Sequence, residues 1–358
     1  VVGSETGMVP VDEDEIIFKG RLGPGDLLGV NLKEGKLYEN FELKDKLANQ
    51  YPYHEFVKKI IRIDKRITSK KEIKLFDFKS LRQRKIAAGY TMEELELILH
   101  PMVAEAKEAT GSMGDDTPIA VLSDKFRPLS HFFRQKFSQV TNPPIDSLRE
   151  QSRMSLKTRF GNLRDVLDSN SYQDNVFVMD SPIITNSIFS KMMKFGQNVT
   201  KIIDCSFDLK ETSLKETIKR IQNEAEAAVL SGKQHVVLTD INTDHDKVSA
   251  PIILATAAVH TFLTRKGIRS FVSIHTQSAE CLDTHYFAVL IGVGATTVNP
   301  YLAQECIRER HEKGLFNNLS YEECVQRYKK AVDQGLLKVM AKLGISVLSA
   351  YRLSLIHI

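Results

Sequence analysis

Between residues 200 and 299 short apolar runs alternate with longer amphipathic segments, and this alternation restricts the possible folds more than any other feature of the sequence. The runs are rich in β-branched residues, which predicts strands, and the segments between them have helical spacing. The expected strands are 200–204, 235–239, 270–275 and 296–299, and the expected helices are 214–230, 250–265 and 279–291. This order predicts an α/β fold made of parallel β/α repeats with right-handed crossovers.

Polar side chains lie at the carboxyl ends of the predicted strands. They are Asp180, Asp204, Asp240, His275 with Thr276, and Asn299. Because ligands of β/α folds bind at this edge, an independent enzyme acting on a small molecule would use Asp204, Asp240 and His275 there. Loops are polar in any case, and a domain interface is a third use of the same edge, so the pattern leaves these alternatives open.

The loop GSMGDDT, residues 111–117, precedes this region. Gly111 and Gly114 permit a sharp bend that would place backbone N–H groups beside Asp115 and Asp116. A second loop, TNPP, follows at 141–144. Two interpretations of these loops remain open. Tight turns around a core element would explain every residue type except the paired aspartates, and the lining of a functional site would also explain the aspartates.

The two loops flank one predicted strand and helix. The apolar run at 119–122 predicts a strand covered on both faces, and apolar residues at helical spacing predict a helix over 128–140. The prolines of the TNPP loop end that helix, and a further helix is expected over 146–156.

The N-terminal part predicts a small β-meander and a basic connection. Strand-like runs lie at 15–18, 27–31 and 36–38, and a helix is expected at 40–49. Lysine and arginine predominate from 58 to 85, which we interpret as a solvated linker in preference to a phosphate-binding patch.

Two capping boxes mark further helices outside the repeats. Thr91 and Glu94 begin a helix that Pro101 is expected to end, and Ser320 with Glu323 begins a helix over 319–332. The apolar sequence GLLKVMAKLGISVL that follows predicts an internal strand.

Several sequence motifs resemble metal-binding or catalytic sites but are not expected to be such sites. The sequence DINTDHD at 240–246 begins like a calcium loop, but His245 replaces the required glycine and Pro251 the bidentate glutamate. Four histidines lie among apolar neighbours and are expected to be core residues: His235, His260, His275 and His285.

The four cysteines lack ligand spacing, the net charge of +4 argues against nucleic-acid binding, and no apolar stretch has the length of a membrane span. We therefore expect a soluble intracellular protein with reduced cysteines, bound to neither nucleic acid nor membrane.

Several longer motifs resemble glutamate synthase in collinear order. They are GRLGPGDLL at 20–28, LRQRKIAAGYT at 81–91, MGDDTPIAVLS at 113–123, FRQKFSQVTNPPIDSLRE at 133–150, VNPYLA at 298–303 and GLLKVMAKLGIS at 335–346. The resemblance covers nearly the whole sequence and implies an internal fragment of that enzyme.

The resemblance also implies a domain organisation. The expected parts are the C-terminal end of the glutamine amidotransferase domain (1–57), a basic helical linker (58–110), the central domain (111–318), the start of the FMN-binding β/α barrel (319–352) and an artefactual tail (353–358) that departs from the family. In the family the central domain connects the glutaminase and synthase domains and helps to line an ammonia tunnel. The residues expected to line the tunnel or the synthase site are Ser112, Met113, Gly114, Asp115, Asp116, Thr117, Thr141, Asn142 and Pro143.

The parent enzyme, by the same resemblance, converts glutamine and 2-oxoglutarate to two glutamates. It uses FMN, an iron–sulfur cluster, and electrons from a reduced pyridine nucleotide or ferredoxin. The family's glutaminase nucleophile is an N-terminal cysteine, whereas residue 1 here is Val1, and the cluster cysteines belong to the barrel. We therefore expect no catalytic residue, metal or cofactor in the fragment, and its partners are the other domains of the same polypeptide.

Overall fold

The computed structural model describes residues 2–5, 7–63, 73–109, 120, 122–124, 127–133, 143–165, 176–244 and 246–357, with side chains as far as 352. The chain divides into two compact units, Val1–Lys58 and Lys59–Ile358. Each unit is described by itself.

The first unit is built around one short hairpin. Its elements are the 3-10 turn η1 (Glu13–Glu15), strands β1 (Gly29–Asn31) and β2 (Lys36–Tyr38), and helices α1 (Asn40–Ala48) and α2 (Tyr53–Lys59). Strands β1 and β2 pair antiparallel, as the β-meander predicts. The predicted strand at 15–18 is wrong, because the chain turns at η1 through a bond from Glu15 N–H to the Asp12 carbonyl and leaves Phe18 exposed.

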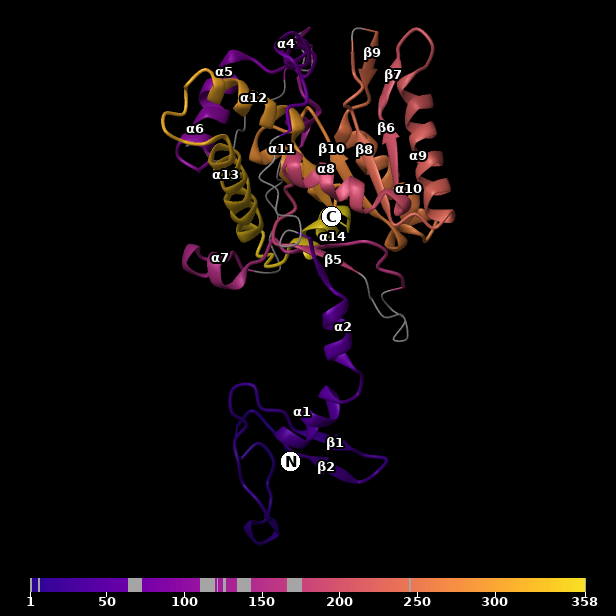
Figure 1. Cartoon of the computed structure of the whole chain (residues 1–358). Helices are drawn as coiled ribbons and strands as arrows, with labels where there is room; N and C mark the ends of the chain where they lie inside the picture. The colour runs from indigo at the N-terminus through magenta and orange to yellow at the C-terminus, as the bar shows by residue number, and fades with distance from the viewer. Residues whose placement is uncertain are drawn as a thin grey trace. The chain divides into compact units, whose positions relative to one another are not determined.

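A four-stranded parallel sheet forms the centre of the second unit (Figure 1). Its strands are β6 (Thr200–Asp204), β8 (His235–Thr239), β10 (Ser273–Gln277) and β11 (Thr297–Asn299). The order is β11-β10-β8-β6, and every neighbouring pair is parallel. The predicted α/β class is therefore confirmed. Asp204, Asp240 and Asn299 lie at the carboxyl ends of these strands, as predicted. His275 lies in the middle of β10, and Asp180 follows a strand of another sheet, so the prediction is wrong for these two residues.

Helices join these strands as crossovers. They are α9 (Leu214–Leu230), α10 (Ile252–Arg265) and α11 (Thr284–Gly292). Helix α9 begins at a complete capping box of Ser213 and Glu216, as predicted. Helix α11 begins five residues later than predicted, because Asp283 caps it by accepting the N–H of Tyr286.

A smaller sheet covers the other face of the parallel sheet. It consists of β3 (Ile61–Arg62), β5 (Phe177–Met179) and β4 (Thr158–Phe160), with helix α8 (Asn186–Phe195) beside it. Val237 packs with Phe160 and Phe177 on this face, whereas Val236 and Leu238 pack in the larger core on the other. This alternation follows from the period of two along a strand. A separate antiparallel ribbon is formed by β7 (Ser206–Asp208) and β9 (Lys247–Ser249).

The segment before the parallel sheet is largely helical. It contains α4 (Phe78–Ala87), α5 (Met92–Glu94), the π-helical turn η2 (Leu95–Leu99) and α6 (His100–Ala104). The capping box of Thr91 and Glu94 is confirmed, but the helix does not end at Pro101. In the π turn the N–H of His100 donates to the carbonyl of Leu95. This wider turn allows the helix to continue although Pro101 has no N–H to donate.

Three helices complete the second unit: α12 (Tyr301–Glu312), α13 (Tyr321–Lys342) and α14 (Leu348–His357). The capping box of Ser320 and Glu323 is present. The strand predicted from Gly335 onward is wrong, because α13 continues through it. Gly335 lies where α13 packs on α11, and a Cβ there would be 2.5 Å from Cγ2 of Thr284. The glycine thus permits close helix packing.

The predicted unit at 119–140 is only partly described. Of the predicted strand, Ala120 and Leu122 are described, and Leu122 is 95% exposed beside a turn, so a buried strand is wrong there. Residues 129–132 form the 3-10 turn η3 (Leu129–Phe132) before an extended Phe133, in place of the predicted helix start. Helix α7 (Ser147–Arg153) follows with Asp146 as its cap, within the helix predicted at 146–156. Two further short turns are η4 (Gln197–Val199) and η5 (Arg269–Phe271).

All four cysteines are buried free thiols, as expected: Cys205, Cys281, Cys306 and Cys324. Within the described ranges, no helix has both the length and the apolar character needed to cross a membrane.

Candidate functional site

Asp240 lies at the carboxyl end of β8, where the sequence places a polar strand end. Its side chain is only 2% exposed. It accepts hydrogen bonds from Ser278 Oγ at 2.9 Å and from the backbone N–H of Ala279 at 2.9 Å. Burial raises the pKa of Asp240 to about 6, although these bonds oppose the shift. The carboxyl group is therefore held rigidly inside the edge.

A second carboxyl group, Glu280, lies close to the first. Burial and the charge of Asp240 together raise the pKa of Glu280 to about 7. The hydroxyl of Tyr286 donates to this carboxylate, and the N–H of Ile252 lies 3.4 Å from its other oxygen. Sequence reasoning missed Glu280, which has no pattern of its own in a turn after β10. The edge thus holds two acids of elevated pKa.

The helical segment before the sheet covers this edge. Nη1 of Arg84, in α4, donates to the carbonyl of Ile241 at 2.6 Å, directly beyond Asp240. The hydroxyl of Tyr90 donates to the carbonyl of Ala279 at 2.8 Å. The Arg84 guanidinium also stacks 4.2 Å from the ring centre of Phe76. The carboxyl edge is consequently closed by the chain's own N-terminal segment.

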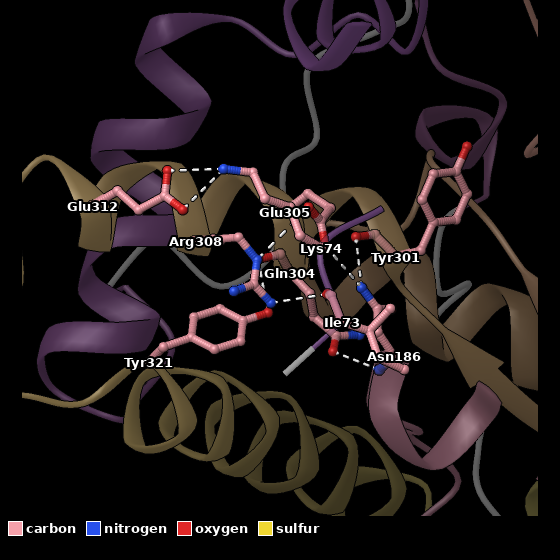
Figure 2. Close-up of polar contacts among 9 residues, drawn as sticks. All are labelled: Ile73, Lys74, Asn186, Tyr301, Gln304, Glu305, Arg308, Glu312 and Tyr321. Atoms are coloured by element: carbon pink, nitrogen blue, oxygen red, sulfur yellow. Dashed lines mark hydrogen bonds and ion pairs between the residues drawn. The ribbon is translucent and has the colours of Figure 1, made fainter. Parts of the chain in front are cut away.

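Helix α12 carries a buried polar face beside this closed edge, shown in Figure 2. Glu305 and Arg308 are 1% and 7% exposed, and they face each other one turn apart at 3.8 Å. Nη2 of Arg308 donates to the carbonyl of Ile73 at 2.9 Å, and its guanidinium lies 3.9 Å from the ring centre of Tyr321. Arg308 therefore binds the backbone of the segment that leads into α4.

Amides extend the polar face toward the sheet. The backbone N–H of Asn186 donates to Gln304 Oε1 at 2.8 Å, and its side-chain amide lies 3.4 Å from a Glu305 oxygen (Figure 2). Asn299, at the end of β11, donates to Asn186 Oδ1 at 2.9 Å. Burial raises the pKa of Glu305, although Arg308 opposes the shift. The amides thus connect α12, α8 and the end of β11 in one network.

Residues 73–85 of the basic stretch are docked on the rest of the second unit. Lys85 forms an ion pair with Glu309 at 2.6 Å, and Leu81 is buried in the main core. Lys74 pairs with Glu312 at 3.1 Å, but both side chains are about half exposed. The interpretation of this stretch as a solvated linker is therefore wrong for residues 73–85, because Lys85 pairs with the buried Glu309 of α12 and Leu81 lies in the core.

The three residues proposed for an independent enzyme are not brought together as one site. Asp204 accepts from the N–H of Ser206 at 2.9 Å and from Asn242 at 3.0 Å. His275 lies in the middle of β10 and not at its end. Its Nε2 is 3.0 Å from Nδ1 of His235. Burial lowers the pKa of His275 well below its ordinary value. Asp180, another of the predicted strand-end residues, forms an ion pair with Arg62 at 2.7 Å.

His235 and His275 are buried, as expected for core residues. His260 is half-buried, and the expectation is wrong for His285, which is exposed on α11. Nδ1 of His275 lies 2.6 Å from Thr297 Oγ1, and Phe160 stacks edge-on to the His275 ring. His260 accepts from Nε of Arg269 at 3.0 Å, and His285 lies 2.9 Å from the carbonyl of Ser130.

The predicted lining residues fall mostly outside the described residues. This applies to Ser112, Met113, Gly114, Asp115, Asp116, Thr117, Thr141 and Asn142. Pro143 is described and exposed. In the rejected calcium loop, Asp244 accepts the N–H groups of Asp246 and Lys247 and so forms a turn. Among the described residues no three acidic, histidine or cysteine side chains converge as metal ligands.

The fold and the closed edge define a class: a parallel β/α domain whose ligand-binding edge is filled by its own preceding helices. The family model described as the glutamate synthase central domain matches residues 83–357, and the model of class-II glutamine amidotransferases matches residues 1–56. The chain therefore belongs to the glutamate synthase central-domain family, preceded by a segment that matches an amidotransferase domain.

Curated relatives agree with this assignment. The chain is 53% identical over 355 residues to the large chain of NADPH glutamate synthase of Azospirillum brasilense, covering 98% of this chain and 23% of that protein. It is 36% identical to ferredoxin-dependent glutamate synthase 1 of Arabidopsis thaliana, covering 98% and 22%. It is 35% identical to the corresponding large chain of Bacillus subtilis, covering 98% and 23%. The chain thus spans about a quarter of the length of these relatives.

Proposed function

We propose that this chain is the connecting part of a glutamate synthase polypeptide and has no complete active site of its own. The parent would convert glutamine, 2-oxoglutarate and reducing equivalents to two glutamates. In this proposal residues 1–57 end a glutaminase domain, 58–110 lead into the central domain at 111–318, and 319–352 begin the FMN-binding barrel. The other domains of the same polypeptide are the partners.

The observation that carries the proposal is the closed carboxyl edge. The segment that follows the amidotransferase-like unit is bound by Arg308 at Ile73 and reaches over Asp240 through Arg84. An enzyme working at this edge would need an open cleft, whereas a connector needs firm docking of the incoming chain. The geometry thus favours the connector over an independent β/α enzyme.

The loops at 112–117 and 141–143 keep their predicted role as the lining of the synthase site or the ammonia passage. Support comes from the sequence and from membership of the family. Such a passage must exclude water so that ammonia stays unprotonated, which requires packed loops and no catalytic side chain.

The parent's cofactors are FMN, an iron–sulfur cluster, and an electron donor that is either a reduced pyridine nucleotide or ferredoxin. The described residues do not fit the cluster, because the four cysteines are separately buried and no three ligands converge. They do not fit a flavin at the carboxyl edge either, because Arg84 and Tyr90 fill it. We assign both groups to other parts of the parent.

The experiment uses the full-length polypeptide with Gly114→Val and, separately, Asn142→Leu. A side chain at Gly114 would strain the bend expected there by about 1–3 kcal/mol and reshape the loop. We expect glutamine hydrolysis to stay measurable while the glutamate formed per glutamine consumed falls. If both variants fold and hydrolysis stays fully coupled to synthesis, the loops are turns without a lining role.

A further inference from the structure

Two arginines meet at the amino-terminal edge of the parallel sheet, opposite the closed carboxyl edge. Arg269, in η5, precedes β10 and makes three hydrogen bonds. It donates to the carbonyl of Val272 at 2.6 Å, to the carbonyl of Gly294 at 3.0 Å and to Nδ1 of His260 at 3.0 Å. Every one of these acceptors is neutral, so the charge of Arg269 is not compensated by them.

Arg352, in α14, reaches the same turn from the other side. Its Nη1 lies 3.3 Å from Thr296 Oγ1, two residues beyond the carbonyl that Arg269 contacts. Its Nε is buried and has no hydrogen-bond partner. Two guanidinium groups therefore share the turn from Gly294 to Thr296, and one of them has an unused donor.

Among the described residues, the charges that act on Arg269 and on His260 at this turn are positive. Burial and the neighbouring Arg352 lower the pKa of Arg269 to about 9, and burial lowers the pKa of Arg352 to about 10. Burial lowers the pKa of His260 to about 4, and the charges of Arg269 and Arg352 contribute to this shift. Across the described ranges, the ion pairs of the chain include neither arginine. Both arginines are half-buried, and holding two like charges close together without a counter-ion is unfavourable, so an anion would stabilise this edge.

Glycine fixes the shape of the turn. Gly294 has a φ of +119°, a value that side chains rarely permit, and a Cβ there would lie 2.4 Å from Nδ1 of His260. The turn can therefore approach His260 and Arg269 closely only because residue 294 is glycine. The arrangement of donors is built into the fold.

We propose that Arg269 and Arg352 form a binding site for a small oxyanion, either a phosphate or a carboxylate group. The guanidinium fork matches the oxygen spacing of both anions, and the unused Nε–H of Arg352 is a donor for either of them. This site is separate from the carboxyl edge and does not depend on the proposed function.

The test is the thermal unfolding of the 358-residue chain in phosphate, in acetate and in chloride at matched ionic strength. We expect phosphate, acetate or both to raise the unfolding midpoint saturably above chloride, because a ligand of the native state stabilises it by mass action. The anion with the larger rise identifies the chemistry. Arg352→Gln should abolish the rise, and the exposed Arg149→Gln should retain it.

Arg352→Lys keeps the charge but removes the fork, so the rise should persist with at least a tenfold weaker half-saturation. This variant also gives a readout if Arg352→Gln does not fold. The proposal is overturned if neither anion exceeds chloride, or if the rise is the same in wild type and in either Arg352 variant.

Discussion

Nζ of Lys85 lies 2.6 Å from a carboxylate oxygen of Glu309, and the two side chains are only 16% and 9% exposed. Lys313 also binds this carboxylate, at 2.8 Å. Although burial opposes it, the bonds from Lys313 and Lys85 hold the pKa of Glu309 below its ordinary value. The ion pair therefore fastens α4 to α12.

The first prediction concerns this ion pair. Lys85→Met should lower the free energy of unfolding by about 1–3 kcal/mol, because a largely buried carboxylate loses one of its two cations. Urea unfolding at pH 7 measures the change. Lys74→Met, which breaks a pair of half-exposed side chains, is the matched control and should cost less than about 1 kcal/mol. Equal effects of the two variants would mean that α4 is not docked through Lys85.

Local signals explain what the sequence predicts well. Ser213 and Glu216 begin α9 at the predicted residue because a capping box depends on four consecutive residues only. Strands β6 and β8 also match their predicted bounds. Strand β8 has a continuous apolar run and is buried along its whole length, as expected inside a parallel sheet, whereas β6 is an edge strand in which Ile203 is buried and Ile202 is exposed.

Non-local packing explains the errors. Helix α12 was not predicted, because its residues 301–310 are all buried and include Glu305 and Arg308, so it has no apolar stripe. The sequence places Lys85 in a solvated linker because its partner Glu309 lies more than 200 residues away along the chain. The closed carboxyl edge, like the small second sheet, depends on such distant contacts.

The second prediction concerns Gly335. Gly335→Ala places a Cβ 2.5 Å from Cγ2 of Thr284, so α13 and α11 must separate. We expect a loss of about 1–3 kcal/mol in the free energy of unfolding. Combining Gly335→Ala with Thr284→Ala should recover most of that loss, since the clashing methyl group is gone. Strictly additive losses would show that the two helices do not meet at these residues.

The third prediction concerns acid stability. Burial lowers the pKa of His235 to about 4 from an ordinary value of 6.5. The unfolded chain binds this proton more readily, so the stability that His235 contributes is lost as the pH falls from about 6.5 to about 4. His235→Asn should therefore reduce the slope of unfolding free energy against pH in that window. The exposed His131→Asn is the control, and an unchanged slope in His235→Asn would contradict the prediction.

The fourth prediction has the opposite sign. The pKa of Asp240 is raised to about 6 from 3.8, so its contribution to stability is complete below pH 3.8 and is lost as the pH rises through about 6. The free energy of unfolding of Asp240→Asn, relative to that of wild type, should therefore increase by up to about 3 kcal/mol as the pH rises from 4 to 7. The same change should lower the pKa of Glu280, which Asp240 helps to raise. Carbon-detected NMR titration of Glu280 measures the second effect, and a constant difference in stability across this range would refute the first.

We propose that the closed carboxyl edge binds the connecting segment and so couples the domains of the parent. The most direct measurement is the ratio of glutamate formed to glutamine consumed by full-length Arg308→Met, with Lys74→Met as the control. Arg308 binds the Ile73 carbonyl from a buried position, whereas Lys74 makes a half-exposed ion pair with the same helix. We expect a lower ratio in Arg308→Met with glutamine hydrolysis retained, and an unchanged ratio in Lys74→Met. A folded Arg308→Met enzyme that keeps the full ratio would contradict it.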